Sequence, residues 1–321
     1  MRLAPLLFLL PALAAASCRD EGVTPDPPRA PSGAGPDASR SPDSGPDAPA
    51  PREPGTRIAS LNVHRLFDTV CHSNDCGPEA YEEAPEQEVF DAKIRRLSAG
   101  IRRLEAEVVL LQEVETQACL DALVGQLPEL KHAVLGETGW AASVDVAVLS
   151  AIPIASVRSH KDRRLPLPDG RTTTFSRDLL EVHLDSGEGE LVVFVAHFRS
   201  KVNDDPERRL AEARAAREIV ADAALASPRA VVVLGGDIND LPGSPPLEAL
   251  TEGGALARVS EGLPAAEIGT YRYGGDWLAL DHLFLARSSP GKAVPGSFRV
   301  FREAYGWAGS DHAAIRASFS R

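Results

Sequence analysis

The stretch "VVVLGGDIND", residues 231–240, is the most informative part of the sequence. An apolar run leads into two glycines and then into Asp237, Asn239 and Asp240. The run predicts a buried strand. Its polar end is open to two interpretations, a turn after the strand or a set of side chains delivered to a functional site. Taken alone, the stretch favours the turn, because Asp and Asn are common turn residues.

Strand and helix patterns alternate early in the chain, and strands follow one another later. Several strands are apolar throughout, so both of their faces should be covered, which predicts two packed sheets with helices outside. The predicted strands span residues 57–63, 107–114, 144–150, 178–185, 190–198, 230–239, 279–286, 297–303 and 313–320. The predicted helices span residues 91–106, 116–127, 205–226 and 244–250.

Composition is that of a globular protein with an acidic surface. The chain has 321 residues, of which 43% are hydrophobic and 25% charged, and its net charge is -12. An acidic surface does not attract polyanions at long range, but a local cluster or a bound cation can reverse the field in one cleft. Only 5% of the residues are aromatic, which disfavours broad base-stacking platforms.

The first 18 residues resemble a bacterial export signal. "LAPLLFLLPALAAAS" is apolar, too short for a stable transmembrane span, and ends at Cys18. "AASC" fits lipoprotein processing and predicts lipidation of Cys18, although Ala15 stands where Leu is usual. The alternative is ordinary signal cleavage nearby.

Residues 19–56 predict a disordered tether, since they are rich in Pro, Ser, Asp and Gly and have little to bury. We therefore expect an exported protein, either a cell-envelope lipoprotein anchored to the membrane or a secreted one. Residues 57–321 are expected to form one catalytic domain. No protein partner is evident from the sequence.

Three further cysteines fit an oxidising compartment. Cys71 and Cys76 flank "HSND" and predict a small disulfide loop. Zinc bound by these thiols with His64 and His72 is the alternative, but the spacing matches no standard zinc finger. Cys119 lies in a predicted helix and is expected to be a small core residue.

Polar residues recur where apolar strands begin or end. Any one of them is most simply a turn residue or a cap. Together they indicate a site, because a sheet brings its strand ends to one edge. Carboxylates and amides suit Mg²⁺, and histidines can move protons, which favours attack of water on a phosphoester. These residues are Asn62, Gln112, Glu113, His197, Asp237, Asn239, Asp281, His282, Asp311 and His312.

The sequence lacks the motifs of several other enzyme classes. It has no Gly-x-Ser-x-Gly elbow, Walker loop, Gly-x-Gly-x-x-Gly after the first strand, or His-Glu-x-x-His. These absences argue against a serine hydrolase, a nucleotide-hydrolysing motor, a Rossmann enzyme and a zinc metalloprotease.

Six short motifs in register resemble the endonuclease/exonuclease/phosphatase superfamily, which has the pancreatic deoxyribonuclease-like fold. They are "LNV", "LLQEV", "AHFRSK", "GGDIND", "LDHLFLA" and "GSDHAAI", in that order. "HFRSK" and "TYRYGGDWLALDH" are most similar to the branch of secreted and surface bacterial nucleases. The resemblance covers about residues 57–321 and implies a four-layer α/β sandwich of two packed mixed β-sheets flanked by helices.

The resemblance also implies a metal site and a phosphate site. Glu113 is expected to be the principal Mg²⁺ ligand, with Asn62 beside it and Asp311 as a further ligand. Mn²⁺ is the alternative ion. Arg177 is expected to contact the substrate phosphate, and Lys201 to add positive charge at the same mouth.

The catalytic residues follow from the same resemblance. Asp237 is expected to orient or activate the attacking water, and Asn239 to hold a phosphate oxygen. His312 is expected to be a catalytic histidine whose tautomer is held by Asp281. His197 is expected to donate a hydrogen bond to the phosphate. Asp145 in "VDVAVLS" is expected to be the carboxylate partner of His197.

Three positions in and around these motifs carry further expectations. Relatives often have an acid where this chain has His64, which either favours a softer ion such as Mn²⁺ or Zn²⁺ or is a simple surface substitution. Asp240 should face away from Asp237 and Asn239 as a turn residue. Gly235 and Gly236 are expected to let the backbone approach the substrate closely.

Three hypotheses for function follow from the sequence. The first is an exported divalent-metal-dependent nuclease that hydrolyses DNA or RNA. The second applies the same chemistry to a phospholipid such as sphingomyelin, to a phosphoinositide or to a small nucleotide. It ranks lower because no Trp- or Phe-rich loop is evident. The third is a non-catalytic surface binding module, which is disfavoured because the main site positions are intact.

Overall fold

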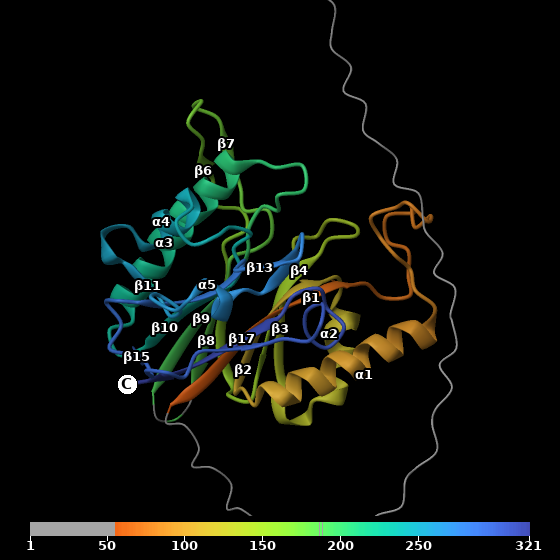
Figure 1. The fold of residues 1–321 in the computed structure, drawn as a ribbon, viewed down its shortest axis with the longest axis horizontal. Helices are drawn as coiled ribbons and strands as arrows, with labels where there is room; N and C mark the ends of the chain where they lie inside the picture. Colours follow the sequence, from red (N-terminus) through yellow and green to blue (C-terminus); the bar gives the residue numbers. More distant parts are fainter. Residues whose placement is uncertain (1–54, 186, 188) are drawn as a thin grey trace, which may run out of the picture. The chain divides into compact units, whose positions relative to one another are not determined.

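The main strands assemble into two large mixed sheets. The computed structural model in Figure 1 describes residues 55–185, 187 and 189–321. The predicted signal peptide, Cys18 and nearly all of the predicted tether lie outside the described residues. Thr56, the last residue of the predicted tether, is already part of the first strand. None of the helices that the structure describes is both long and apolar enough to cross a membrane.

The first sheet has the strand order β15–β17–β1–β2–β4–β3, with β16 also paired to β17. Strands β1 and β2 are parallel, and the other pairs are antiparallel. The strands are β1 (Thr56–Leu66), β2 (Val108–Val114), β3 (His132–Gly136), β4 (Asp145–Ser150), β15 (Lys292–Ala293), β16 (Arg299–Phe301) and β17 (Ala314–Ser320). The sequence pattern did not indicate β3 or β15.

The second sheet has the strand order β11–β14–β10–β9–β8–β5. Strands β9 and β10 are parallel, and the other described pairs are antiparallel. The strands are β5 (Ile154–Ser159), β8 (Leu180–Asp185), β9 (Glu190–His197), β10 (Val231–Asp237), β11 (Leu256–Arg258) and β14 (Asp281–Ala286). Two short hairpins lie outside the sheets and pair β6 (Leu165–Pro166) with β7 (Thr172–Thr173), and β12 (Tyr271–Tyr273) with β13 (Asp276–Leu278).

Four helices form where the sequence predicts them, and the short helix α5 was not predicted. Helix α3 begins as expected, with Pro206 in its first turn and the Asp205 side chain accepting the Arg208 N–H. Helix α1 ends at Glu105, which adopts a left-handed conformation. The helices are α1 (Gln87–Leu104), α2 (Gln117–Gln126), α3 (Pro206–Ala226), α4 (Pro245–Thr251) and α5 (Ala265–Ile268), with 3₁₀ turns η1 (Pro128–Leu130) and η2 (Glu252–Gly254).

The central strands are apolar throughout because each face is buried against a different layer. In β2, Val109 and Leu111 pack with α1 and α2, whereas Leu110 packs against the second sheet. In β9, Val193 faces the first sheet and Phe194 faces α3. Figure 1 shows α1 and α2 beside one sheet, and α3 and α4 beside the other. The predicted four-layer sandwich is confirmed.

The two glycines of β10 serve packing between strands and sheets rather than approach to the substrate. A Cβ atom on Gly235 would lie 2.6 Å from Leu283 and 2.7 Å from Leu110 of the opposite sheet. Gly236 has φ +144°, and a Cβ atom there would lie 1.9 Å from the Ala196 carbonyl oxygen. The expectation drawn from the sequence for this pair is therefore wrong, because protein atoms fill the space beside both residues.

The structure shows the pairing and burial of the three cysteines that it describes. A disulfide joins Cys71 to Cys76 in the segment between β1 and α1. Those two thiols are therefore not available to a zinc ion. Cys119 is free and buried in α2, where its thiol lies 3.2 Å from the Leu66 carbonyl oxygen.

Substitution of Gly236 by Ala should destabilise the domain strongly. The added methyl group combines an unfavourable φ with an overlap on the neighbouring strand, so we expect unfolding to become easier by at least about 2 kcal/mol. Gly243→Ala is the matched control, because Gly243 also has positive φ (+84°), yet a Cβ atom there would meet no described atom within 4 Å. Urea unfolding of both variants tests this, and equal losses would contradict a packing role for Gly236.

Candidate active site

One row of paired residues forms the floor of the candidate site. Asp237 at the end of β10 lies opposite His197 on β9 and opposite Asp281 on β14. All three residues are buried. Because the register is fixed along three strands, residues more than 80 positions apart in sequence meet at one sheet edge.

Bulges at the ends of β1 and β2 direct another acid toward this row. Glu113 is the extra residue where the β2–β4 register shifts, and its φ is +69°. His64 and Arg65 lie in the matching irregularity of β1, with φ of 52° and 49°. The Arg65 N–H donates to Glu113 Oε2 at 2.8 Å. Bulges of this kind often re-aim side chains near functional sites.

Asn62 connects the two sheets at this point. Its Nδ2 donates to Glu113 Oε1 at 3.1 Å and to Asp237 Oδ2 at 3.2 Å. Its Oδ1 accepts the His64 N–H at 2.9 Å. In this arrangement Asn62 holds the two carboxylates together, and its own role as a metal ligand stays a prediction.

His312 and Asp281 form a buried pair. His312 Nδ1 lies 2.8 Å from Asp281 Oδ2, and His312 Nε2 lies 3.9 Å from Asp237 Oδ2. Burial alone would lower the pKa of His312, but the carboxylates of Asp281 and Asp237 outweigh it and raise that pKa to about 10. The Tyr271 ring packs against the imidazole, with the ring centres 4.9 Å apart. His312 is therefore held as an imidazolium with Nε2 toward Asp237.

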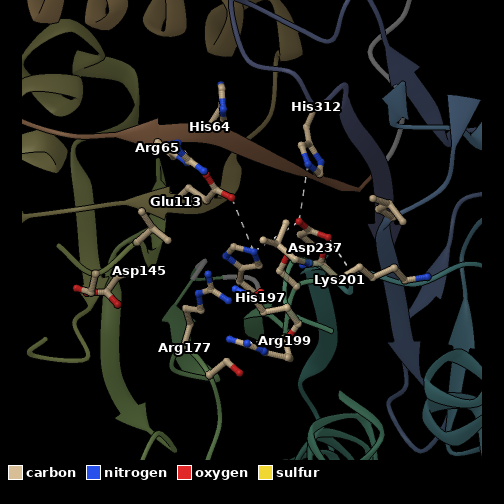
Figure 2. Close-up of a pocket in the computed structure, with 18 of the residues that line it drawn as sticks. His64, Arg65, Glu113, Asp145, Arg177, His197, Arg199, Lys201, Asp237 and His312 are labelled. Atoms are coloured by element: carbon tan, nitrogen blue, oxygen red, sulfur yellow. Dashed lines mark hydrogen bonds and ion pairs between the residues drawn. The ribbon is translucent and has the colours of Figure 1, made fainter. Parts of the chain in front are cut away.

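His197 has a different charge state. Its Nε2 lies 3.6 Å from Asp237 Oδ2 and 3.9 Å from Glu113 Oε1 (Figure 2). Burial, with Arg177 and His312 nearby, holds the pKa of His197 well below its usual range. The two histidines thus differ in charge, since His197 is neutral and His312 is protonated. This difference suits His197 to donating a hydrogen bond to a phosphate and His312 to acid catalysis.

The pairing of Asp145 with His197 expected from the sequence is not formed. Asp145 accepts hydrogen bonds from the Thr138 N–H and hydroxyl and from the Ser143 hydroxyl. It therefore holds the loop between β3 and β4, and Figure 2 shows its carboxylate turned away from His197. His197 Nδ1 is buried and has no hydrogen-bond partner among the described residues. Asp145 lines the cleft as a supporting residue of its wall.

Asp237 and Asn239 occupy the centre of the floor. Burial raises the pKa of Asp237 to about 7, despite the opposing effect of His312. Asn239 has φ +55°, its N–H donates to Asp237 Oδ1 at 2.9 Å, and its Nδ2 donates to the Phe198 carbonyl at 3.1 Å. The second hydrogen of that amide can still reach a phosphate oxygen.

The residues expected to bind a metal fit a hard divalent cation. Glu113 and Asp311 both line the cleft, and Asp311 Oδ1 is buried without a hydrogen-bond partner among the described residues. An orphan carboxylate oxygen of this kind suits a cation that takes oxygen ligands. His64 Nε2 lies 3.8 Å from Asp311 Oδ2 and is partly exposed, so it can join the same site. When bound, such an ion polarises a phosphate oxygen and lowers the pKa of water.

The floor opens into a cleft of about 1050 Å³ with cationic walls. Arg177 lines it, as predicted, and so does Lys201, whose Nζ pairs with Asp240 at 2.9 Å. Further lining residues were not predicted from the sequence, because none of them begins or ends a predicted strand. They are Arg65, Arg199, Arg208, Tyr81, Trp140, Tyr271 and Tyr273. Arg199 and Tyr271 lie inside motifs quoted for the family, which is the signal that could have found them.

Other polar residues at strand ends are structural. Gln112 is buried and bonds to Ser60. His282 lies 3.1 Å from the Asp240 carbonyl oxygen, and burial lowers its pKa to about 4. The Asp240 carboxylate pairs with Arg209 as well as Lys201, which fits its expected orientation away from Asp237.

The geometry suits hydrolysis of a phosphoester. Asp237 is placed to orient a water molecule and take its proton. His312, held by Asp281, can give a proton to a departing oxygen or stabilise charge on the phosphate. His197 and Asn239 can donate to phosphate oxygens from the same floor.

Comparison with known proteins places this geometry in context. The model of the Endonuclease/Exonuclease/phosphatase family matches residues 57–300. No curated protein matches the sequence. Among solved structures, D. rerio TDP2 complexed with single strand DNA product is similar, with TM-score 0.59, 17% identity, and 84% of this chain and 100% of that chain covered.

Two other structures share the fold. Truncated Caenorhabditis elegans TDP2 has TM-score 0.58 and 17% identity over 83% of this chain and 97% of its own. Staphylococcus aureus beta toxin, as a mutant with bound magnesium ions, has TM-score 0.54 and 17% identity over 82% of this chain and 99% of its own. At these identities the likeness is one of fold.

Two carboxylate substitutions should distinguish Asp281, which belongs to the catalytic pair with His312, from Asp145, which belongs to the wall of the cleft. Asp281→Asn removes the anion that orients His312, so we expect kcat to fall by about 10²-fold to 10⁴-fold. Asp145→Asn should leave kcat within about threefold, because the hydrogen bonds of Asp145 go to the wall loop. Steady-state hydrolysis of bis(4-nitrophenyl) phosphate measures both. A collapse of kcat in Asp145→Asn would restore Asp145 to the catalytic set.

Proposed function

The chain belongs to the endonuclease/exonuclease/phosphatase family, and on this premise we propose that it is an exported Mg²⁺-dependent nuclease. Family membership implies a metal-dependent phosphoester hydrolase with this phosphodiesterase-like fold. The proposal adds the substrate class, the ion and the location. The nuclease acts by attack of water on a phosphodiester of DNA or RNA.

The cationic cleft around the acidic floor carries the proposal. Arg65, Arg177 and Arg199 line the cleft, and none of them forms an ion pair with a carboxylate among the described residues. The Arg65 guanidinium lies 4.7 Å from the centre of the Tyr81 ring, and the Arg199 guanidinium donates to the Asn203 carbonyl oxygen at 3.0 Å. A protein with a net charge of -12 thus lines this cleft with arginines that no described carboxylate neutralises, which suits a phosphodiester.

Exposed aromatic side chains on the cleft suit single-stranded nucleic acid. Trp140 is 80% exposed and Tyr273 is 71% exposed, and both line the cleft. An aromatic ring next to a cationic groove can stack on a base of any identity. The low aromatic content of the chain gave no sign of this feature, because only four of its described aromatic residues line the cleft.

A second candidate, a phosphodiesterase that acts on phospholipid, rests on the same rim. Val202 is 74% exposed next to Lys201 on the cleft, and with Trp140 it could enter a bilayer surface.

Export is supported by the sequence of residues 1–18 and by the disulfide between Cys71 and Cys76. A lipid anchor at Cys18 would hold the enzyme at the cell envelope.

Removal of the metal and substitution of Asp237 should each abolish nucleic-acid cleavage. We expect EDTA to stop degradation of plasmid and single-stranded DNA, and excess Mg²⁺ to restore it. Asp237→Asn should lower kcat at least about 10³-fold with Mg²⁺ present, because the water loses its orienting group. Asp169→Asn is the control, because Asp169 is an exposed acid that pairs with Arg171 away from the cleft.

Phosphocholine release from sphingomyelin liposomes, tested in parallel, distinguishes the lipid candidate. Cleavage of liposomes with DNA and RNA left intact would replace the nuclease proposal. Absence of any hydrolysis, together with no Mg²⁺ binding by calorimetry, would favour a non-catalytic binding module.

Trp140→Ala should selectively weaken the binding of single-stranded DNA. Loss of one stacked base corresponds to about a 5-fold to 150-fold rise in KM for an oligonucleotide. Hydrolysis of bis(4-nitrophenyl) phosphate should not change, because this substrate does not reach the rim. Unchanged KM for the oligonucleotide would show that Trp140 does not bind bases.

A further inference from the structure

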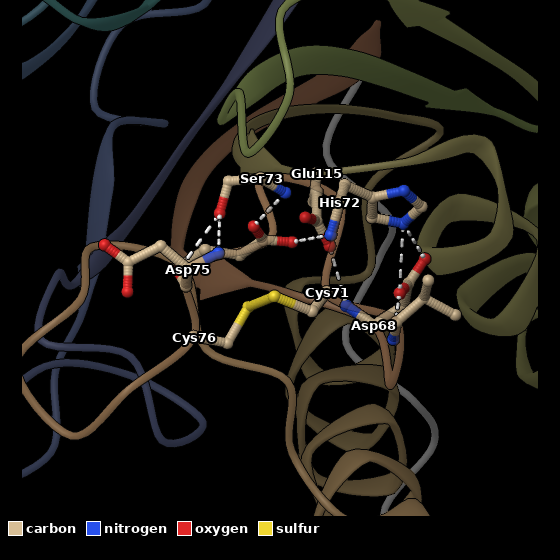
Figure 3. Close-up of a disulfide and its surroundings, with 9 residues drawn as sticks. Asp68, Cys71, His72, Ser73, Asp75, Cys76 and Glu115 are labelled. Carbon is tan, nitrogen blue, oxygen red and sulfur yellow. Dashed lines mark hydrogen bonds and ion pairs between the residues drawn. A yellow bond between two sulfur atoms is a disulfide. The ribbon is translucent and has the colours of Figure 1, made fainter.

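A second acidic cluster lies outside the cleft, beside the disulfide. Asp68, Glu82 and Glu115 are 8%, 1% and 3% exposed, and the imidazole of His72 closes the group (Figure 3). Asp68 follows β1, Glu115 follows β2, and His72 and Glu82 belong to the segment that leads to α1. None of these residues lines the cleft.

Backbone hydrogen bonds satisfy only part of this charge. The N–H groups of His72 and Ser73 donate to the two oxygens of Glu82 at 2.6 and 2.7 Å. The Asp68 N–H donates to Glu115 Oε2 at 2.8 Å. Among the described residues, no lysine or arginine pairs with any of the three acids. The Val70 N–H and the Thr116 hydroxyl donate to Asp68 at 2.7 and 2.8 Å, and His72 can offset at most one of the three negative charges. The remaining buried charge calls for a bound cation or shared protons.

One oxygen points into the cluster without a partner. Glu115 Oε1 is buried and accepts no hydrogen bond among the described residues. The carboxyl of Glu82 lies next to that of Glu115, so no donor comes from that side unless one of the two is protonated. An orphan anionic oxygen inside a protein calls for an ion or a proton.

We propose that Asp68, His72 and Glu115 bind a Zn²⁺ ion. One ligand atom from each of these residues lies within 4.8 Å of the other two. His72 Nε2 lies 3.3 Å from Asp68 Oδ1 and 3.4 Å from Oδ2, which is long for a charge-assisted hydrogen bond. A tetrahedral ion with ligands at about 2.0–2.1 Å separates them by about 3.3 Å. The imidazole favours zinc over Ca²⁺ or Mg²⁺, which take oxygen ligands.

The ion ties together segments that approach the catalytic floor from outside. Glu115 lies two residues after Glu113, and Asp68 lies three residues after Arg65, whose N–H bonds to Glu113. The Cys71–Cys76 disulfide constrains the loop that presents His72, and Glu82 fixes the backbone of that residue. The His72 side chain is 39% exposed, which gives the ion a path to solvent. With three protein ligands the ion keeps a fourth position for water, and it stabilises the bulge that carries Glu113.

Zinc titration of the full chain tests the site independently of nuclease activity. Glu113→Gln/Asp311→Asn is the background, because it removes the principal carboxylates of the cleft. We expect this protein to bind one Zn²⁺ per chain in calorimetry or competition with a chromophoric chelator. We also expect Zn²⁺ to raise its Tm relative to EDTA. Absence of zinc binding in this background would overturn the proposal. That result is expected if Glu82 and Glu115 share a proton and the cluster holds no ion.

Ligand variants in that background locate the ion. His72→Ala changes a partly exposed side chain and should lower zinc affinity at least about 10-fold while the fold, followed by circular dichroism, is kept. Glu115→Gln should also lower zinc affinity at least about 10-fold, and it provides the test if His72→Ala fails to fold. His132→Ala on β3 is the matched control and should bind as the parent does. Equal affinity of the His72→Ala and His132→Ala proteins would overturn the assignment.

Discussion

The hydrogen bonds from Asn62 to Glu113 and Asp237 join the two sheets at the edge where the chemistry lies. Asn62 and Glu113 belong to the first sheet and Asp237 to the second. The contact depends on close packing of the two sheets, and that packing requires the absence of a side chain at Gly235, where a Cβ atom would lie 2.7 Å from Leu110 of the first sheet. Every other residue of the floor takes its position from this meeting of strand ends.

Charge at this edge is arranged by burial as much as by residue type. Two histidines share one carboxylate neighbour, Asp237, yet differ in protonation. His312 has a second anion, Asp281, at 2.8 Å, whereas His197 has an arginine nearby. The acids suited to a cation and the arginines suited to a phosphodiester therefore line one cleft, and Arg65, Arg177 and Arg199 form no ion pair with a carboxylate among the described residues.

The segment after β1 gives the fold a second polar centre next to the first. Its buried acids and its disulfide lie behind the bulge of β2, and Glu113 and Glu115 are directed to different surroundings by that bulge. Stability of this segment and geometry of the cleft are thus coupled through one short piece of backbone, residues 113–115.

Sequence alone determined the layers and most of the floor. Apolar strands and amphipathic helices have periods that local chemistry fixes, and the family motifs lie at strand ends, so Asp237, Asp281 and His312 could be named. Partner choice was decided only in three dimensions. Asp145 turned to Thr138 and Ser143, and the glycines served packing, because loop paths and close contacts depend on atoms distant in sequence. The cationic and aromatic lining of the cleft likewise comes from loops, a short hairpin and the ends of β1 and α3, and no periodic pattern brings these together.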